Sequence, residues 1–145
     1  MNAVGILVGG VIPAVFLGLG TVLMRASMGA GMTIPMYLAV VGTTIAGIGW
    51  GAVLIGPGDA VAMKANLYAG LMGLTWSVAI ACIAYGFGVL KLPVSIIAPL
   101  TNSNALVALL VGAIAFSEWK TLNMTTATVG AALICAGATI VSLSK

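Results

Sequence analysis

Long apolar runs alternate along the chain with short segments that carry the charged residues. Each run is about 20 residues long, which is the length that an α-helix needs to cross the hydrocarbon layer of a bilayer. The runs lack the strict polar and apolar alternation of transmembrane β-barrel strands. The pattern therefore predicts an all-α, polytopic transmembrane helix bundle, formed by residues 1–145 as one domain with about five spans. The expected spans cover residues 4–24, 33–55, 67–90, 94–116 and 125–143.

Glycine and proline mark several boundaries of these spans. The segment Gly56–Asp59 places a proline between two glycines and predicts a break, so that residues 56–66 form the longest loop. Pro93 follows a very short connection and is expected to open the fourth span, because proline is favoured in the first turn of a helix. Pro13 falls inside the first span, where neighbouring groups can satisfy the carbonyl that a proline leaves free.

Composition indicates that lipid, rather than water, surrounds most of the protein. Hydrophobic residues make up 62% of the chain and charged residues 5%, whereas a soluble domain carries about 25% charged residues. The net charge of +3 comes from cations that are scattered singly between the spans. We therefore expect the lipid bilayer as a partner and no nucleic-acid surface.

Residues that perform catalysis or bind metals are scarce. The chain has no histidine, and its two cysteines, Cys82 and Cys135, fall in the middle of spans without the spacing of a zinc site. Its only acids, Asp59 and Glu118, fall at loops, so no carboxylate is expected within the bilayer to carry protons. We expect a protein that is not an enzyme and has no cofactor and no metal site.

The fourth span contains a run of polar residues, Thr101–Asn104, shortly after Pro99. Successive polar groups cover more than one face of a helix and are costly where they face lipid. Pro99 has no N–H and leaves the carbonyl near Ser95 without its usual partner, so the helix is expected to open locally. The amides of Asn102 and Asn104 either join helices through interhelical hydrogen bonds or line a cavity for a solute.

Other polar and aromatic residues fall inside the second and third spans. Trp76 and Tyr85 lie at a depth where their N–H and O–H groups need partners, so they either form the wall of a site or pack in the core. Thr43 and Thr44 are weaker candidates, because a hydroxyl often bonds to the backbone of its own helix.

Glycine is abundant, with 20 residues. Small residues allow membrane helices to approach closely. Gly130 and Gly137 lie on one face of the fifth span, and this face serves either close packing within one bundle or a seam between two chains.

The last two spans resemble a known family. The stretch KLPVSIIAPLTNSNALVALLVGAIAFSEWK, followed by VGAALICAGATIVSLSK, is similar to the closing helices of an EamA-like unit of the drug/metabolite transporter superfamily. The similar features are the helix opened by proline after a tight turn, its polar or small middle, Glu118 at its end and the pattern G-A-x-L-I-x-x-G in the last span. Towards the N-terminus the resemblance rests on Pro13, Gly18 and Gly20.

The resemblance implies a multi-pass transporter in the inner membrane of a bacterial cell, working by alternating access on a small-molecule solute. It also implies a binding site formed mainly by the third and fourth spans. Together with the polar run, it points to the following substrate-binding residues: Asn102, Asn104, Thr101, Ser103, Trp76 and Tyr85. The residues with an expected structural or interface role are Pro93, Pro99, Glu118, Gly130 and Gly137.

Most members of this family carry two such units as inverted repeats, whereas this chain corresponds to one unit, or half of a ten-helix carrier. Inverted repeats form the transport site at their interface, so the resemblance implies an antiparallel homodimer. Five spans would place Lys64 and Lys120 on one side of the membrane and Arg25, Lys91 and Lys145 on the other. This near balance suits a dual topology under the positive-inside rule. With only five basic residues, the same near balance can also arise by chance. Alternatively, another chain sets the orientation of this one.

The sequence favours a transporter of small polar metabolites, such as amino acids or sugars, because the candidate site contains neutral polar groups. The lack of acids within the spans disfavours exchange of cationic drugs for protons. Two other functions use the same features: a structural or assembly subunit without transport of its own, and a flippase for lipid headgroups.

Overall fold

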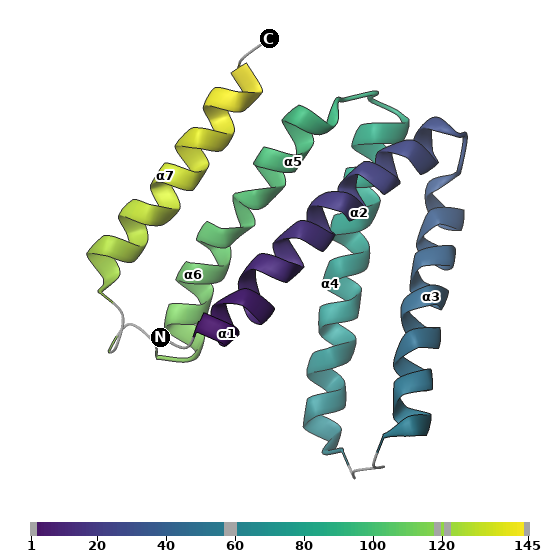
Figure 1. Ribbon diagram of the computed structural model, residues 1–145, viewed down its shortest axis with the longest axis horizontal. Coiled ribbons are helices and arrows are strands. Elements are labelled where there is room, and N and C mark those ends of the chain that lie inside the picture. Colours follow the sequence, from purple (N-terminus) through teal and green to yellow (C-terminus); the bar gives the residue numbers. More distant parts are fainter. Residues whose placement is uncertain (1–2, 57–60, 118–119, 121–122, 144–145) are drawn as a thin grey trace. The chain divides into compact units, whose positions relative to one another are not determined.

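The computed structural model describes residues 3–56, 61–117, 120 and 123–143. The regular secondary structure in these ranges is entirely helical, and the described residues form no strand (Figure 1). In chain order they are α1 (Ala3–Ile6), the π-helical segment η1 (Leu7–Val11), α2 (Ile12–Gly29), α3 (Ile34–Ile55), α4 (Met63–Gly88), α5 (Val94–Asn102), α6 (Asn104–Ala115) and α7 (Met124–Leu143).

Five helical stretches of the described chain are long and apolar enough to cross a membrane. They are Ala3–Gly29, Ile34–Ile55, Met63–Gly88, Val94–Ala115 and Thr125–Leu143. The prediction of an all-α protein with five spans is thus confirmed. The third stretch begins at Met63 rather than at residue 67, and it therefore includes Lys64, whose ammonium group can reach the headgroup layer from the first turn.

Pro13 is accommodated by a wider helical turn. The π-helical segment η1 ends directly before α2, and the N–H of Ile12 donates to the carbonyl of Leu7, five residues back. A proline cannot donate to the carbonyl of Gly9, four residues back, and its ring crowds that carbonyl. The wider register of η1 takes up this mismatch without ending the span.

The contacts between helices divide the chain into two compact units, of which the first contains Met1–Thr21 and Leu92–Lys145. In this unit α7 packs against α5 and α6 (Figure 1). The side chains buried in these helices are Ile97, Ala113, Ala131 and Ala138. Three of the four are alanines, so α7 approaches its neighbours through small residues, as is common between membrane helices.

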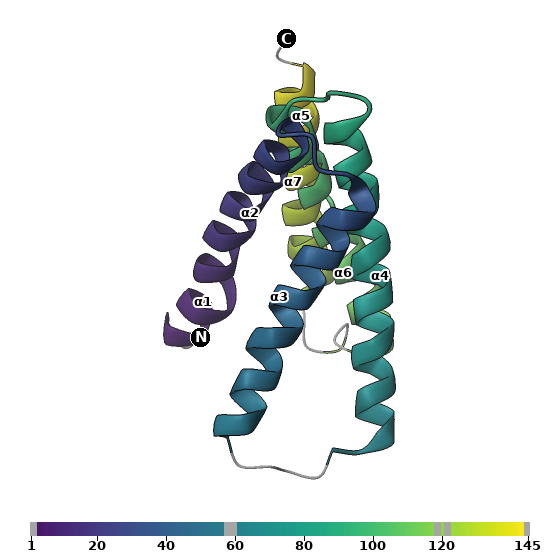
Figure 2. The same cartoon turned by 90° about the vertical axis from the view of Figure 1, so that its right-hand side faces the viewer.

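The second unit contains Val22–Lys91. Its helices α3 and α4 pack as an antiparallel pair, side by side in both views (Figures 1 and 2). The end of α2 packs on the end of α4, since a Cβ placed on Gly88 would lie 3.4 Å from the sulfur of Met28. The buried side chains here are Met24, Met28, Ala84 and Phe87. The prediction that both units belong to one transmembrane domain stays a prediction.

Asp59 and Glu118 lie outside the described residues. The expected helix-end role of Glu118 therefore stays a prediction. At the start of the fourth span, Pro93 directly precedes Val94, the first residue of α5. The preceding Lys91 has a left-handed backbone with φ of 56°, which turns the chain sharply between α4 and α5.

A glycine in the left-handed conformation ends α2. Gly31 has φ of 91°, its N–H donates to the carbonyl of Met28 at 3.2 Å, and the N–H of Met32 donates to the carbonyl of Ser27 at 3.2 Å. These two bonds form a Schellman motif, in which the left-handed residue is usually glycine because a Cβ is disfavoured there. The motif directs the chain from α2 into α3.

We expect Gly31→Ala to destabilise the protein by about 1–2 kcal/mol, because alanine must hold the same left-handed backbone. The measurement is thermal unfolding of the purified protein in detergent. Gly73→Ala is the matched control, since a Cβ at Gly73 in α4 meets no atom within 4 Å. The control should unfold at the wild-type temperature or above it. Equal unfolding temperatures for Gly31→Ala and the wild type would contradict this account of the turn.

Candidate functional site

The fourth span is broken near its middle. Helix α5 ends at Asn102, α6 begins at Asn104, and Ser103 lies between them with φ of −64° and ψ of −9°. The N–H of Ser103 donates to the carbonyl of Leu100 at 3.1 Å, and the N–H of Leu106 donates to the carbonyl of Ser103 at 3.1 Å. These bonds join residues three apart and tighten the turn. The turn is therefore tightened at Ser103, four residues after Pro99, and the expected opening near the Ser95 carbonyl stays a prediction.

A small cavity, open to the surface of the protein, lies between α5 and α7. Its volume is about 140 Å³. It is lined by Pro99 and Asn102 of α5 and by Ile134, Gly137, Ala138 and Val141 of α7. Asn102 is the only one of these lining residues whose side chain carries hydrogen-bonding groups. The structure thus brings together three of the residues expected from the sequence: Pro99, Asn102 and Gly137.

Several hydroxyl groups within the spans bond to their own helices. Thr43 donates to the carbonyl of Ala39 at 2.7 Å and Thr44 to that of Val40 at 2.8 Å, as expected from the sequence. Thr101, one of the expected site residues, donates to the carbonyl of Ala98 at 2.9 Å. The same pattern holds for Thr21, Thr75, Ser77, Thr139 and Ser142. These hydroxyls are satisfied without a ligand.

The amides of Asn102 and Asn104 differ from these hydroxyls. Neither side chain has a hydrogen-bond partner among the described residues, and both are exposed. An amide carries two donors and one acceptor, and leaving them unpaired in an apolar medium is costly. Asn102 lines the cavity, whereas Asn104 lies beyond the break and is not part of its wall. The two amides therefore need partners at different places.

The aromatic residues of α4 lie on opposite faces of that helix. Trp76 and Tyr85 are nine residues apart on the continuous helix Met63–Gly88, which corresponds to about half a turn beyond two full turns. Ile83 and Phe87 follow Trp76 on its own face, and Phe87 is fully buried. Trp76 therefore lies on the same face as the buried Phe87 near the end of α4, although its own side chain is 40% exposed, and Tyr85 lies on the opposite face. A site on one face of α4 can include only one of the two.

The glycines of α7 leave open space. A Cβ placed on Gly130 or Gly137 would meet no atom within 4 Å. Gly137 borders the cavity, which its missing side chain helps to keep open. Gly130 lies two turns earlier on the same face of α7, where a side chain would likewise have room.

The apolar wall of the cavity was not expected from the sequence. Ile134, Ala138 and Val141 share a face of α7 with Gly137, and their spacing along the helix is the available signal. That spacing identifies a face but does not say which helix packs on it. The pairing of this face with Pro99 and Asn102 follows only from the contact between α5 and α7.

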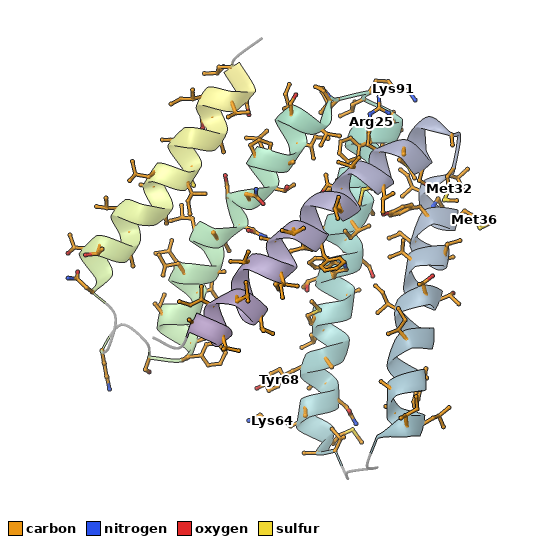
Figure 3. All side chains as sticks on the ribbon, in the orientation of Figure 1. Arg25, Met32, Met36, Lys64, Tyr68 and Lys91 are labelled. Carbon is orange, nitrogen blue, oxygen red and sulfur yellow. The ribbon has the colours of Figure 1, made fainter. Side chains whose placement is uncertain are left out.

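The cations of the second unit lie at helix ends. Figure 3 shows Arg25 and Lys91 at the same end of this unit. A Cβ on Gly29 would lie 3.7 Å from Nη1 of Arg25, so the guanidinium extends along α2 towards its C-terminal end. A cation there is favoured by the helix dipole. At the first turn of α4, Nζ of Lys64 lies 5.8 Å from the ring centroid of Tyr68.

A larger hollow, of about 420 Å³, lies beside the turn between α2 and α3. Met32 and Met36, labelled in Figure 3, form part of its wall. The hydroxyl of Ser27 donates to the sulfur of Met32 at 3.1 Å. The hollow is lined by residues of the Schellman turn and of the start of α3. No polar group around it is both buried and without a partner among the described residues, so we assign it to the turn.

Comparison of the chain with protein-family models, with curated proteins and with solved structures found no match. The class of the protein therefore rests on its own helices. Five helices that are long and apolar enough to span a bilayer define a multi-pass, all-α membrane protein.

Proposed function

We propose that this protein transports small polar metabolites across the membrane by alternating access. One observation carries the proposal: the amide of Asn102 lines the α5–α7 cavity within a span and has no hydrogen-bond partner among the described residues. An unpaired amide in a lipid environment costs several kcal/mol. A solute that enters the cavity would satisfy it.

The break at Ser103 supports the same proposal. Transporters commonly form their sites where a membrane helix is interrupted near the bilayer midplane. Ser103 falls near the middle of the span Val94–Ala115. The absence of an N–H at Pro99 and the tight turn at Ser103 give α5 and α6 a joint about which they can tilt. Such a joint offers a route for the site to open to either side.

An antiparallel homodimer is the form in which we propose that the chain works. Few side chains are buried, and at most 11% of any candidate span is buried within a single chain. The resemblance of the last two spans to an EamA-like unit supports a second, inverted copy, and it also supports a bacterial inner membrane as the location.

The test is uptake into liposomes that contain the purified protein, with radiolabelled urea, butyramide, alanine and glucose as probes. We expect the protein to speed the uptake of at least one probe above that of protein-free liposomes. Pro99→Ala should reduce this uptake about tenfold, because the restored N–H bonds to the Ser95 carbonyl and stiffens the joint by about 1.4 kcal/mol.

The control for this variant is Pro35→Ala, since Pro35 lies in the first turn of α3, where a proline breaks no helical bond. It should transport at the wild-type rate. If the wild type carries none of the four probes and its variants change only assembly, the protein is a structural subunit and the proposal is wrong.

A further inference from the structure

We infer that the α5–α7 cavity takes small uncharged solutes that have one hydrogen-bonding end and one apolar side, with short aliphatic amides as the best-matched chemical class. The inference rests on the proposed function and narrows its substrates. It excludes sugars by size and both amino-acid zwitterions and organic ions by charge.

Charge is the first constraint on the solute. The described residues that line the cavity are Pro99, Asn102, Ile134, Gly137, Ala138 and Val141, and none is ionisable. Transfer of an ion from water to such surroundings is very unfavourable unless an opposite charge is supplied. The chain's two acids are Asp59 and Glu118, and neither belongs to α5 or α7. The transfer of a neutral solute does not carry this free-energy cost.

Hydrogen bonding is the second constraint. The Asn102 amide presents one acceptor and two donors. A primary amide matches it edge to edge, donating to the Asn102 carbonyl oxygen and accepting from its NH₂ group. Opposite Asn102, the α7 wall is apolar, with Ile134, Ala138 and Val141. A ligand site of this kind combines a mainly apolar lining with few polar groups that fix orientation.

Size is the third constraint. The cavity has a volume of about 140 Å³. An apolar protein cavity of about 150 Å³ holds a benzene molecule. The α5–α7 cavity therefore suits about six non-hydrogen atoms. Butyramide has this size, one amide end and a propyl chain that can lie against Ile134 and Val141.

The experiment measures thermal unfolding of the purified protein in detergent, titrated with butyramide, butyrate or butylammonium. These probes share a hydrocarbon chain and differ in charge. Butyramide should raise the unfolding temperature by about 3 °C once it reaches roughly ten times its Kd. Butyrate and butylammonium at the same concentrations should give no shift. Equal shifts from all three probes, or no shift from butyramide, would overturn the inference.

Two glycine variants test the position of the site. Gly137→Val adds bulk at the cavity wall, and Gly130→Val adds the same bulk elsewhere on α7; a Cβ meets no atom within 4 Å at either position. The shift caused by butyramide should vanish in Gly137→Val and persist in Gly130→Val. Loss of the shift in both variants, or in neither, would show that butyramide binds elsewhere.

The inference and the proposed function fail in different ways. If liposomes that contain the protein take up butyrate or butylammonium as fast as butyramide, transport stands and the solute class is wrong. If butyramide raises the unfolding temperature but no probe crosses faster than in protein-free liposomes, the site stands and transport is wrong.

Discussion

Replacing Asn102 with leucine is expected to reduce solute uptake about a hundredfold while the protein stays folded. Asn102 has no hydrogen-bond partner among the described residues, so its loss leaves no described protein group unpaired. A bound solute would lose two hydrogen bonds, each worth about 1.5 kcal/mol, and every 1.4 kcal/mol corresponds to a factor of ten. The measurement is initial uptake into liposomes, with thermal unfolding as the check of folding.

Two variants serve as controls for this result. Asn104→Leu removes the same group beyond the break, outside the cavity wall, and should retain uptake. Ser77→Ala removes a hydroxyl that bonds only to the carbonyl of Gly73 in its own helix, and it should behave as the wild type. Equal loss of uptake in Asn102→Leu and Asn104→Leu would show that both amides join helices rather than bind solute.

The second large effect concerns orientation. If the chain inserts in both directions and works as an antiparallel dimer, a variant forced into one direction should lose nearly all uptake. Lys64→Ala combined with Lys120→Ala leaves cations on one side only. Arg25→Ala combined with Lys91→Ala and Lys145→Ala leaves them on the other side only. The positive-inside rule then gives each variant one orientation, opposite to that of its counterpart.

Co-expression distinguishes orientation from damage to the fold. Each variant alone should be inactive, and the two expressed together should recover most of the wild-type uptake, because the pair supplies both orientations. Labelling of single cysteines introduced near both ends of a span reports the direction of insertion. Full activity of either variant alone, with all its copies inserted in one direction, would rule out the antiparallel dimer.

The polar run in the fourth span shows which structural features the local sequence predicts and which it does not. Pro99 cannot donate a hydrogen bond, and this property alone predicts that the helix opens nearby. The structure places the tight turn at Ser103, between α5 and α6. The two neighbouring candidate site residues differ in their partners. The hydroxyl of Thr101 donates to the carbonyl of Ala98, while Asn102 lines the cavity together with residues of α7. The sequence places these two residues side by side and does not separate them.

The aromatic residues of α4 show a second feature that the sequence alone does not predict, namely which face of a helix is packed. Trp76 and Tyr85 are alike in the sequence, as aromatic groups inside one span. Their nine-residue spacing puts them on opposite faces of α4. The buried Phe87 lies on the face of Trp76 near the end of the helix, while Trp76 itself is 40% exposed. Which face of a membrane helix is packed depends on its neighbours, because both faces are apolar and lipid can cover either.

The sequence by itself determined that the protein is helical and has five spans, since hydrophobic transfer and backbone hydrogen bonding act on each apolar run separately. The expected span boundaries lie within five residues of the ends of the five candidate helices. Only the tertiary structure decided that Asn102, and not Asn104, faces a cavity. That choice depends on α7, which is distant along the chain and contributes Gly137 and the apolar wall. Contacts between distant segments depend on how whole helices pack, and the composition of one helix does not specify its partner.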